Sequence, residues 1–147
     1  MISLINLKKI FISSDHAGFK LKDHIKIYLK KKNFNIEDLG PFSEDTVDYP
    51  VYAHKVARKV KTHKSNIGIL VCGSGTGMNI AANKHKNIRA AQCFNLKSTK
   101  LSRLHNDANI ITLGSRLISR KNALKFINIF LNTKFEGGRH KKRLNKI

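Results

Sequence analysis

A glycine-rich segment has the residue types and spacing of an anion-binding loop. Cys72 ends the apolar run IGILVC (67–72), and GSGTG (73–77) follows it directly. Three glycines at alternating positions before a helix expose a row of backbone N–H groups, which suits a phosphate or a developing oxyanion. Met78 occupies the place of the third glycine of a dinucleotide fingerprint, and the Gly-Lys-Ser/Thr of a nucleotide phosphate loop is absent. The alternative interpretation is a tight strand-to-helix turn.

Cys72 stands where a thiol could do chemistry. It faces the start of a helix and its backbone N–H groups, the setting in which a cysteine becomes reactive. A cysteine that ends a buried strand is, by itself, more often a small core residue, and we expect this of Cys93, which has no glycine loop. Two cysteines exclude a four-thiolate zinc site, and the seven histidines lack metal-ligand spacing. We therefore expect neither a metal nor an organic cofactor.

Other polar residues follow the remaining expected strands or lie at helix ends. Asp15 and His16 close the first strand, and Arg116 follows the last one. In open α/β sheets, ligands bind at the carboxyl ends of the strands, so these residues are candidates for one site. Each also has an ordinary structural interpretation, as a turn residue, a helix cap or a solvated charge. The same holds for His105-Asn106-Asp107 at a helix end and for Arg139, His140 and Arg143 in the basic tail.

Short apolar strands alternate with amphipathic helices along the chain. We expect strands at 8–13, 34–40, 67–72, 88–93 and 109–114. The expected helices span 17–33, 51–63, the stretch from the glycine loop to about 84, 96–106 and 119–132, before a basic tail at 137–147. This alternation predicts an α/β fold: one domain (1–147), a three-layer α/β/α sandwich on a five-stranded, mainly parallel, Rossmann-like sheet.

The chain has an unusual charge, with 29 basic and 9 acidic residues among 147, a formal net charge of +20. Most of the excess is lysine spread along the expected helices, including Lys20, Lys22, Lys26 and Lys30, which we interpret as a solvated surface. The alternative is a nucleic-acid-binding protein, but stacking aromatic residues are scarce and tryptophan is absent. The first residues reverse the order of a secretory signal, and no stretch of about 18 apolar residues could span a membrane. We expect a cytoplasmic protein with no specific nucleic-acid partner.

Six motifs, taken in order, distinguish this sequence. They are SDHAG (14–18), DYP (48–50), CGSGTG (72–77), SRLHNDAN (102–109), LGSR (113–116) and GRHKKR (138–143). The set closely resembles type B ribose-5-phosphate isomerase, a family that also includes galactose-6-phosphate and allose-6-phosphate isomerases. The resemblance runs from about Lys8 to Ile147. It implies the same fold and an aldose–ketose isomerisation of ribose 5-phosphate through an enediolate, with a hexose 6-phosphate as the alternative substrate.

The resemblance also implies a role for each candidate residue. Cys72 would be the base, Ser74 would assist it, and Asp15 with His105 would open the sugar ring. Met78 cannot be the base that one branch of the family uses, so the sequence falls in the cysteine branch. The substrate-binding residues would be His16, Tyr49, Gly73, Gly75, Thr76, Gly77, Asn106, Arg116, Arg139 and Arg143.

The resemblance finally implies an assembly. In a two-fold homodimer, the basic tail at 137–147 would cross to the neighbouring subunit and bring Arg139 and Arg143 to its phosphate site. Arginine suits this task because its planar fork binds phosphate oxygens better than lysine does.

Overall fold

The computed structural model describes residues 8–147. The expectation about a secretory signal concerns the first seven residues, which lie outside the described part. The strands are β1 (Lys9–Ser14), β2 (Asn35–Asp38), β3 (Ile67–Cys72), β4 (Ala90–Gln92) and β5 (Ile110–Gly114). The helices are α1 (Phe19–Lys31), α2 (Tyr49–Val60), α3 (Thr76–Ala82), α4 (Leu96–Asn106), α5 (Arg120–Asn132) and α6 (Arg139–Leu144). Every expected element is present, and the second and fourth strands are shorter than predicted.

The five strands form one sheet in the order β2-β1-β3-β5-β4, and all four pairings are parallel. The predicted α/β fold is therefore confirmed. The strand order, which periodicity does not reveal, puts β3 between β1 and β5. The turns after these three strands consequently meet at one edge of the sheet.

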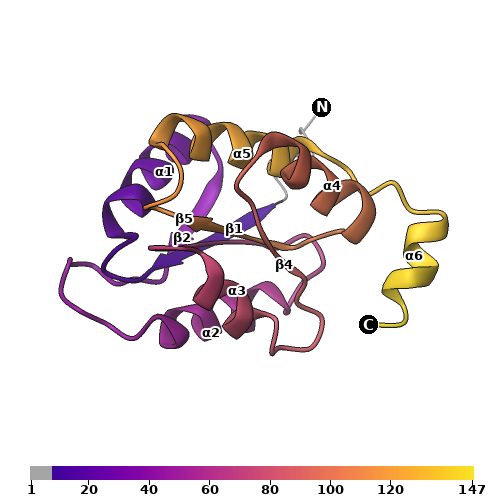
Figure 1. Cartoon of the computed structure of the whole chain (residues 1–147), viewed down its shortest axis with the longest axis horizontal. Coiled ribbons are helices and arrows are strands. Elements are labelled where there is room, and N and C mark those ends of the chain that lie inside the picture. Colours follow the sequence, from indigo (N-terminus) through magenta and orange to yellow (C-terminus); the bar gives the residue numbers. More distant parts are fainter. Residues whose placement is uncertain (1–7) are drawn as a thin grey trace.

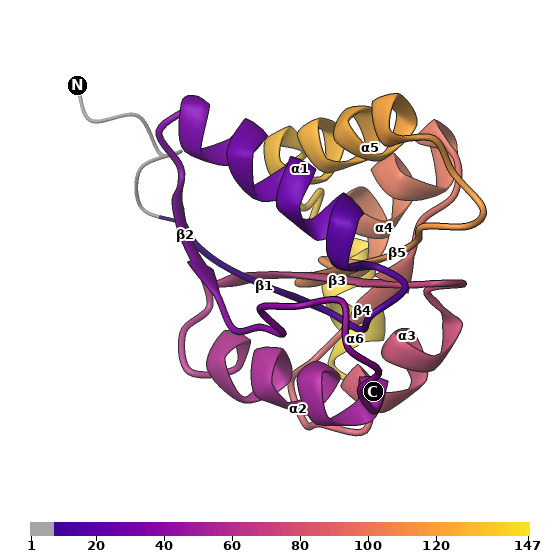
Figure 2. The same cartoon turned by 90° about the vertical axis from the view of Figure 1, so that its left-hand side faces the viewer.

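Helices cover both faces of the sheet. Figure 2 shows α1, α4 and α5 on one face and α2 and α3 on the other. Side chains alternate along β3. Ile69 and Val71 therefore enter the hydrophobic core on the face covered by α1 and α5, while Leu70 and Cys72 enter the core on the face covered by α2 and α3. Helix α6 stands apart from these layers, beside the end of α4 (Figure 1). Within the described chain, no helix combines the length and the apolar character needed to cross a bilayer.

Lys22 corrects the interpretation of the charge. We expected it on a solvated helix face, but its side chain is fully buried, with Nζ 2.9 Å from Asp38 Oδ1. Nζ also donates to the Pro41 carbonyl, and Lys26 Nζ lies 3.0 Å from Asp38 Oδ2. Burial alone would raise the pKa of Asp38, but hydrogen bonds from Lys22, the Gly40 N–H and Lys26 outweigh it and hold this pKa below its usual value. The Lys22–Asp38 ion pair thus links α1 to the end of β2.

We expect Lys22→Met to lower the free energy of unfolding by about 3 kcal/mol at neutral pH, because it leaves a nearly buried carboxylate with one partner fewer. A group with a lowered folded-state pKa stabilises the protein above its unfolded pKa, and the effect is lost as the pH falls through the folded value. The difference from the wild type should therefore shrink below the ordinary Asp value of 3.8. Denaturant titrations at several pH values measure it. Lys30→Met, at an exposed position of α1, is the matched control and should change stability by less than about 0.5 kcal/mol.

Candidate active site

A cavity of about 320 Å³ lies at the carboxyl edge of the sheet, where the turns after β1, β3 and β5 meet. Ligands of open parallel sheets bind at this edge, beside a point where the chain reverses its direction of winding. Eight predicted site residues line the cavity, together with two that the sequence did not indicate. The lining residues are Asp15, His16, Ala17, Tyr49, Cys72, Gly73, Ser74, Gly77, Arg116 and Leu117.

Cys72 ends β3 at the base of this cavity, with 5% of its surface exposed. The N–H of Gly75 donates a hydrogen bond to Cys72 Sγ at 3.0 Å. Gly75 has φ +79°, in the left-handed region, and an added Cβ would lie 3.0 Å from the Leu113 carbonyl carbon. Glycine thus permits the tight turn that folds the loop back over the sulfur.

Cys93 is a contrasting thiol. It is 1% exposed in the core on the opposite face of the sheet. Burial raises the pKa of Cys93, and hydrogen bonds with Thr99 and Ser102 offset only part of that rise. The structure thus places Cys93 in the core, as expected, and gives only Cys72 a place in the cavity.

Asp15 and His16 occupy the turn after β1. Asp15 is 8% exposed, and its Oδ1 accepts a hydrogen bond from the Gly18 N–H at 2.9 Å. The Asp15 N–H donates to the Val71 carbonyl at 3.1 Å, which holds this turn against β3. His16 Nδ1 accepts from the Val47 N–H at 3.4 Å. In the neutral ring the proton is then on Nε2, which makes that nitrogen a donor.

Tyr49 and Arg116 lie directly against the glycine loop. A Cβ added to Gly77 would be 2.6 Å from Tyr49 Cζ, so only glycine lets the phenol pack on the start of α3. A Cβ added to Gly73 would be 3.1 Å from Arg116 Nη1, which places the guanidinium over the loop. A phenol and a guanidinium thus lie on opposite ends of the same short loop.

Gln92 is a residue that sequence reasoning missed. It ends β4, and its Nε2 donates to the Ser74 carbonyl at 2.8 Å and to Thr76 Oγ1 at 3.1 Å. The sequence offered one signal for this residue, its position near the end of an expected strand, at the same carboxyl edge of the sheet. Gln92 fixes the outer side of the glycine loop, whose Gly75 and Thr76 do not line the cavity themselves.

The remaining predicted residues gather at the opposite edge of the sheet. Helix α4 ends at Asn106, before β5 begins at Ile110, whereas Cys72 pairs with Gly114 at the far end of β5. At about 3.3 Å per residue, the strand alone separates the two edges by roughly 13 Å. Within one chain, His105 therefore does not meet Asp15. His105 and Asn106 lie instead at the end of α4, and Arg139 and Arg143 lie on the neighbouring helix α6.

His105 stacks on His140, with ring centroids 4.2 Å apart and planes 14° from parallel. Glu136 Oε2 lies 3.6 Å from His105 Nε2 and 3.8 Å from His140 Nε2. Burial, together with His105 and Arg139, lowers the pKa of His140, which favours its neutral form. Three potential metal ligands, two imidazoles and a carboxylate, are close together here. A tetrahedral ion needs lone pairs that converge on one point, however, and nearly parallel rings aim theirs side by side. The arrangement fits a stacked support for His105 better than a metal centre.

The fold and the cavity define an α/β enzyme whose thiol faces a glycine loop, with a guanidinium and an imidazole on the same cavity. The family model of the ribose/galactose isomerases matches residues 10–147. The chain belongs to this family.

Relatives cover nearly the whole chain. A putative sugar phosphate isomerase of Rickettsia bellii is 46% identical over 94% of this chain and 96% of its own. Ribose-5-phosphate isomerase B of Escherichia coli is 41% identical over 96% and 95%. The crystal structure of ribose-5-phosphate isomerase B from Mycoplasma genitalium with bound ribulose-5-phosphate is 43% identical, covers 96% and 94%, and superposes with a TM-score of 0.93.

Proposed function

We propose that this protein interconverts ribose 5-phosphate and ribulose 5-phosphate. The observation that carries the proposal is the Cys72 thiol, held by the Gly75 N–H in a cavity that also presents Asp15, His16 and Arg116. The relative from M. genitalium, which binds ribulose-5-phosphate, supports the choice of a pentose phosphate.

In this proposal Cys72 moves the proton. As a thiolate it takes the proton from C2 of the open-chain aldose and returns a proton to C1. The hydroxyl proton moves from O2 to O1 at the same time, which completes the ketose. Negative charge develops on the sugar oxygens in the enediolate between these steps. The first N–H groups of α3 have no acceptor within the helix and lie beside Cys72, so they can stabilise that charge. Ser74 adds a hydroxyl at the same place.

The phosphate binds to His16 and Arg116, which line the cavity. His16 offers an Nε2–H donor because Val47 occupies its Nδ1, and Arg116 offers a planar fork of donors. Tyr49, which packs on Gly77, lines the cavity where the sugar would lie.

Two copies of the chain complete each site. One chain does not bring His105 to Asp15, yet ring opening requires a proton donor and acceptor near the substrate. We infer a two-fold dimer in which His105, Asn106, Arg139 and Arg143 of one copy enter the Cys72 cavity of the other. His105 stacks on His140 of α6 and Asn106 follows it at the end of α4, so in this dimer the two residues enter the neighbouring cavity together with the tail.

Turnover of ribose 5-phosphate, measured beside galactose 6-phosphate and allose 6-phosphate, tests the function. We expect the highest kcat/KM with ribose 5-phosphate. One added methylene changes the binding free energy by only about 1–3 kcal/mol, so weak activity with a hexose phosphate is compatible with the proposal. A higher kcat/KM with either hexose phosphate, or no isomerisation at all, would contradict it.

Dialysis against a chelator should leave the isomerase activity unchanged. A thiolate, an imidazole and guanidinium groups supply the base, the acid and the phosphate contacts, so the proton transfer needs no Lewis acid. Activity is measured before and after dialysis, with dialysis against buffer alone as the control. A loss that a divalent cation restores would show that a metal takes part.

A further inference from the structure

The end of α4 is an uncommon turn. Asp107 follows the helix with φ 44° and ψ 44°, the left-handed conformation that residues other than glycine seldom adopt. His105 and Asn106 occupy the last turn before it. Their side-chain directions therefore depend on how the helix ends.

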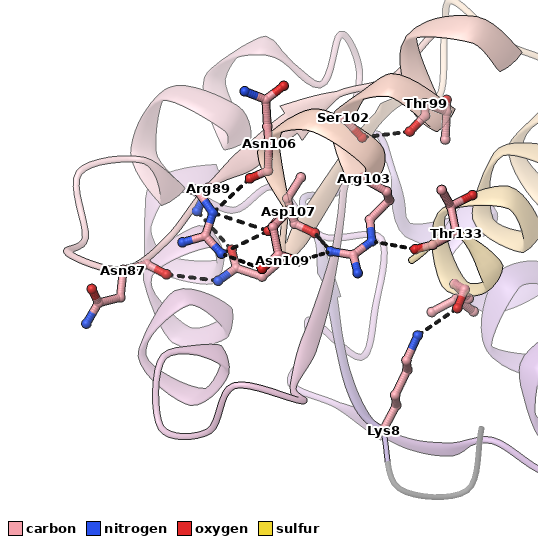
Figure 3. Close-up of polar contacts among 12 residues, drawn as sticks. Lys8, Asn87, Arg89, Thr99, Ser102, Arg103, Asn106, Asp107, Asn109 and Thr133 are labelled. Atoms are coloured by element: carbon pink, nitrogen blue, oxygen red, sulfur yellow. Dashed lines mark hydrogen bonds and ion pairs between the residues drawn. The ribbon is translucent and has the colours of Figure 1, made fainter. Parts of the chain in front are cut away.

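Arg89 holds this turn from the segment before β4 (Figure 3). Its Nε donates to the carbonyls of Asn106 at 2.9 Å and Asp107 at 3.2 Å. Its Nη2 donates to the Asp107 carbonyl at 2.9 Å and lies 3.5 Å from Asp107 Oδ2. The last carbonyls of a helix lack N–H donors within it and carry partial negative charge, and a guanidinium supplies both the donors and a positive charge.

Arg89 is itself fixed in place. Its N–H donates to Asn109 Oδ1 at 2.8 Å, the Asn109 N–H donates to the Arg89 carbonyl at 3.0 Å, and Asn109 Nδ2 donates to the Asn87 carbonyl at 2.8 Å. The contacts form a closed path from the segment before β4 to the end of α4 and the start of β5. The backbone that carries the Arg89 guanidinium is thus held in place by hydrogen bonds.

Arg103 supports the same turn differently. Its Nη1 donates to Asp107 Oδ1 at 2.9 Å, while its Nε donates to the Thr133 carbonyl at 3.2 Å. Arg103 is 8% exposed and its guanidinium lies over the Phe130 ring, so it is also part of the core. The Arg89 side chain is 28% exposed, and within residues 8–147 the hydrogen bonds of its guanidinium go to Asn106 and Asp107. Arg89 is therefore the residue whose replacement separates positioning from folding.

We infer that Arg89 is a positioning residue for His105. It acts by fixing the carbonyls that end α4, and the imidazole of His105 then reaches the substrate of the neighbouring copy in one orientation. This inference rests on the proposed function, since the task of His105 is to open the sugar ring. Arg89 does not itself touch the substrate in this scheme.

The test is a double-mutant cycle between Arg89→Met and His105→Ala. We expect Arg89→Met alone to lower kcat for ribose 5-phosphate by about 10- to 100-fold with little change in KM, as for residues that orient a functional group. In the His105→Ala background it should lower kcat by less than about twofold, because the residue through which it acts is gone. The residual turnover of His105→Ala comes from sugar that opens spontaneously in water.

Two further variants separate positioning from general damage. Arg89→Lys keeps the charge but loses the fork and should recover only part of the activity. Arg58→Met, at an exposed arginine of α2, should match the wild type. The ring resonances of His105 in NMR spectra should move in Arg89→Met and stay in place in Arg58→Met.

Equal losses of kcat in both backgrounds, or unchanged kcat together with unmoved His105 resonances, would overturn the inference. A wild-type protein that does not isomerise ribose 5-phosphate would instead contradict the proposed function. The NMR measurement does not depend on turnover, so the two failures remain distinguishable.

Discussion

The Cys72→Ala variant should lose kcat for ribose 5-phosphate by a factor of about 10²–10⁴, the range that a positioned base contributes. Its affinity for ribose 5-phosphate should change little, because the phosphate contacts of His16 and Arg116 remain. Cys72→Ser should be nearly as inactive, since a hydroxyl is a far weaker base than a thiolate at neutral pH. Steady-state kinetics with separate binding measurements on both variants provide the comparison.

Cys93→Ala is the matched control for this prediction. Cys93 is buried on the opposite face of the sheet, so its replacement should cost some stability through a small cavity and leave kcat intact. Alkylation should inactivate the wild type, with ribose 5-phosphate giving protection, and should leave Cys72 modified and Cys93 free. Near-normal turnover of Cys72→Ala would assign the proton transfer to another group.

Local patterns predicted the half of the site that surrounds Cys72. Glycines at alternating positions after a fully apolar strand define a loop whose geometry depends on few other residues. The position of Asp15, His16 and Arg116 just after strands was sufficient to predict a shared edge, because parallel strands end together. Periodicity did not reveal the strand order, which depends on packing between distant segments.

The sequence did not reveal two features of the structure, each for a physical reason. Lys22 lies three and seven residues before Ile25 and Leu29, the spacing of one helix face, but its charge argued for solvent. Only the three-dimensional structure shows that Asp38 lies against that face of the helix. His105 was paired with Asp15 by resemblance, and the sequence could not show that α4 ends at the edge of the sheet opposite to Cys72.

Because Cys72 and Arg139 lie at opposite edges of the sheet, the dimer proposal predicts how much activity a mixture of two inactive variants should recover. Cys72→Ala and Arg139→Ala proteins should each be nearly inactive, because one lacks the base and the other part of the phosphate clamp. When equal amounts exchange subunits at random, about half of the dimers pair unlike chains. In each of these, one site takes both intact residues and the other takes neither. About a quarter of the wild-type activity should therefore return.

The two edges of the sheet supply the control for this experiment. Asp15 lies with Cys72, and His105 lies with Arg139. A mixture of Cys72→Ala with Asp15→Ala should therefore keep only the residual activity of the separate variants, as should His105→Ala with Arg139→Ala. In either mixture, both sites of a mixed dimer inherit one damaged half, whichever chain provides it. Native mass spectrometry verifies that subunits exchange in every mixture. No recovery between opposite edges despite proven exchange would mean that each site belongs to a single chain. Recovery within a same-edge pair would mean that those two residues reach one site from different chains, which contradicts the proposed arrangement.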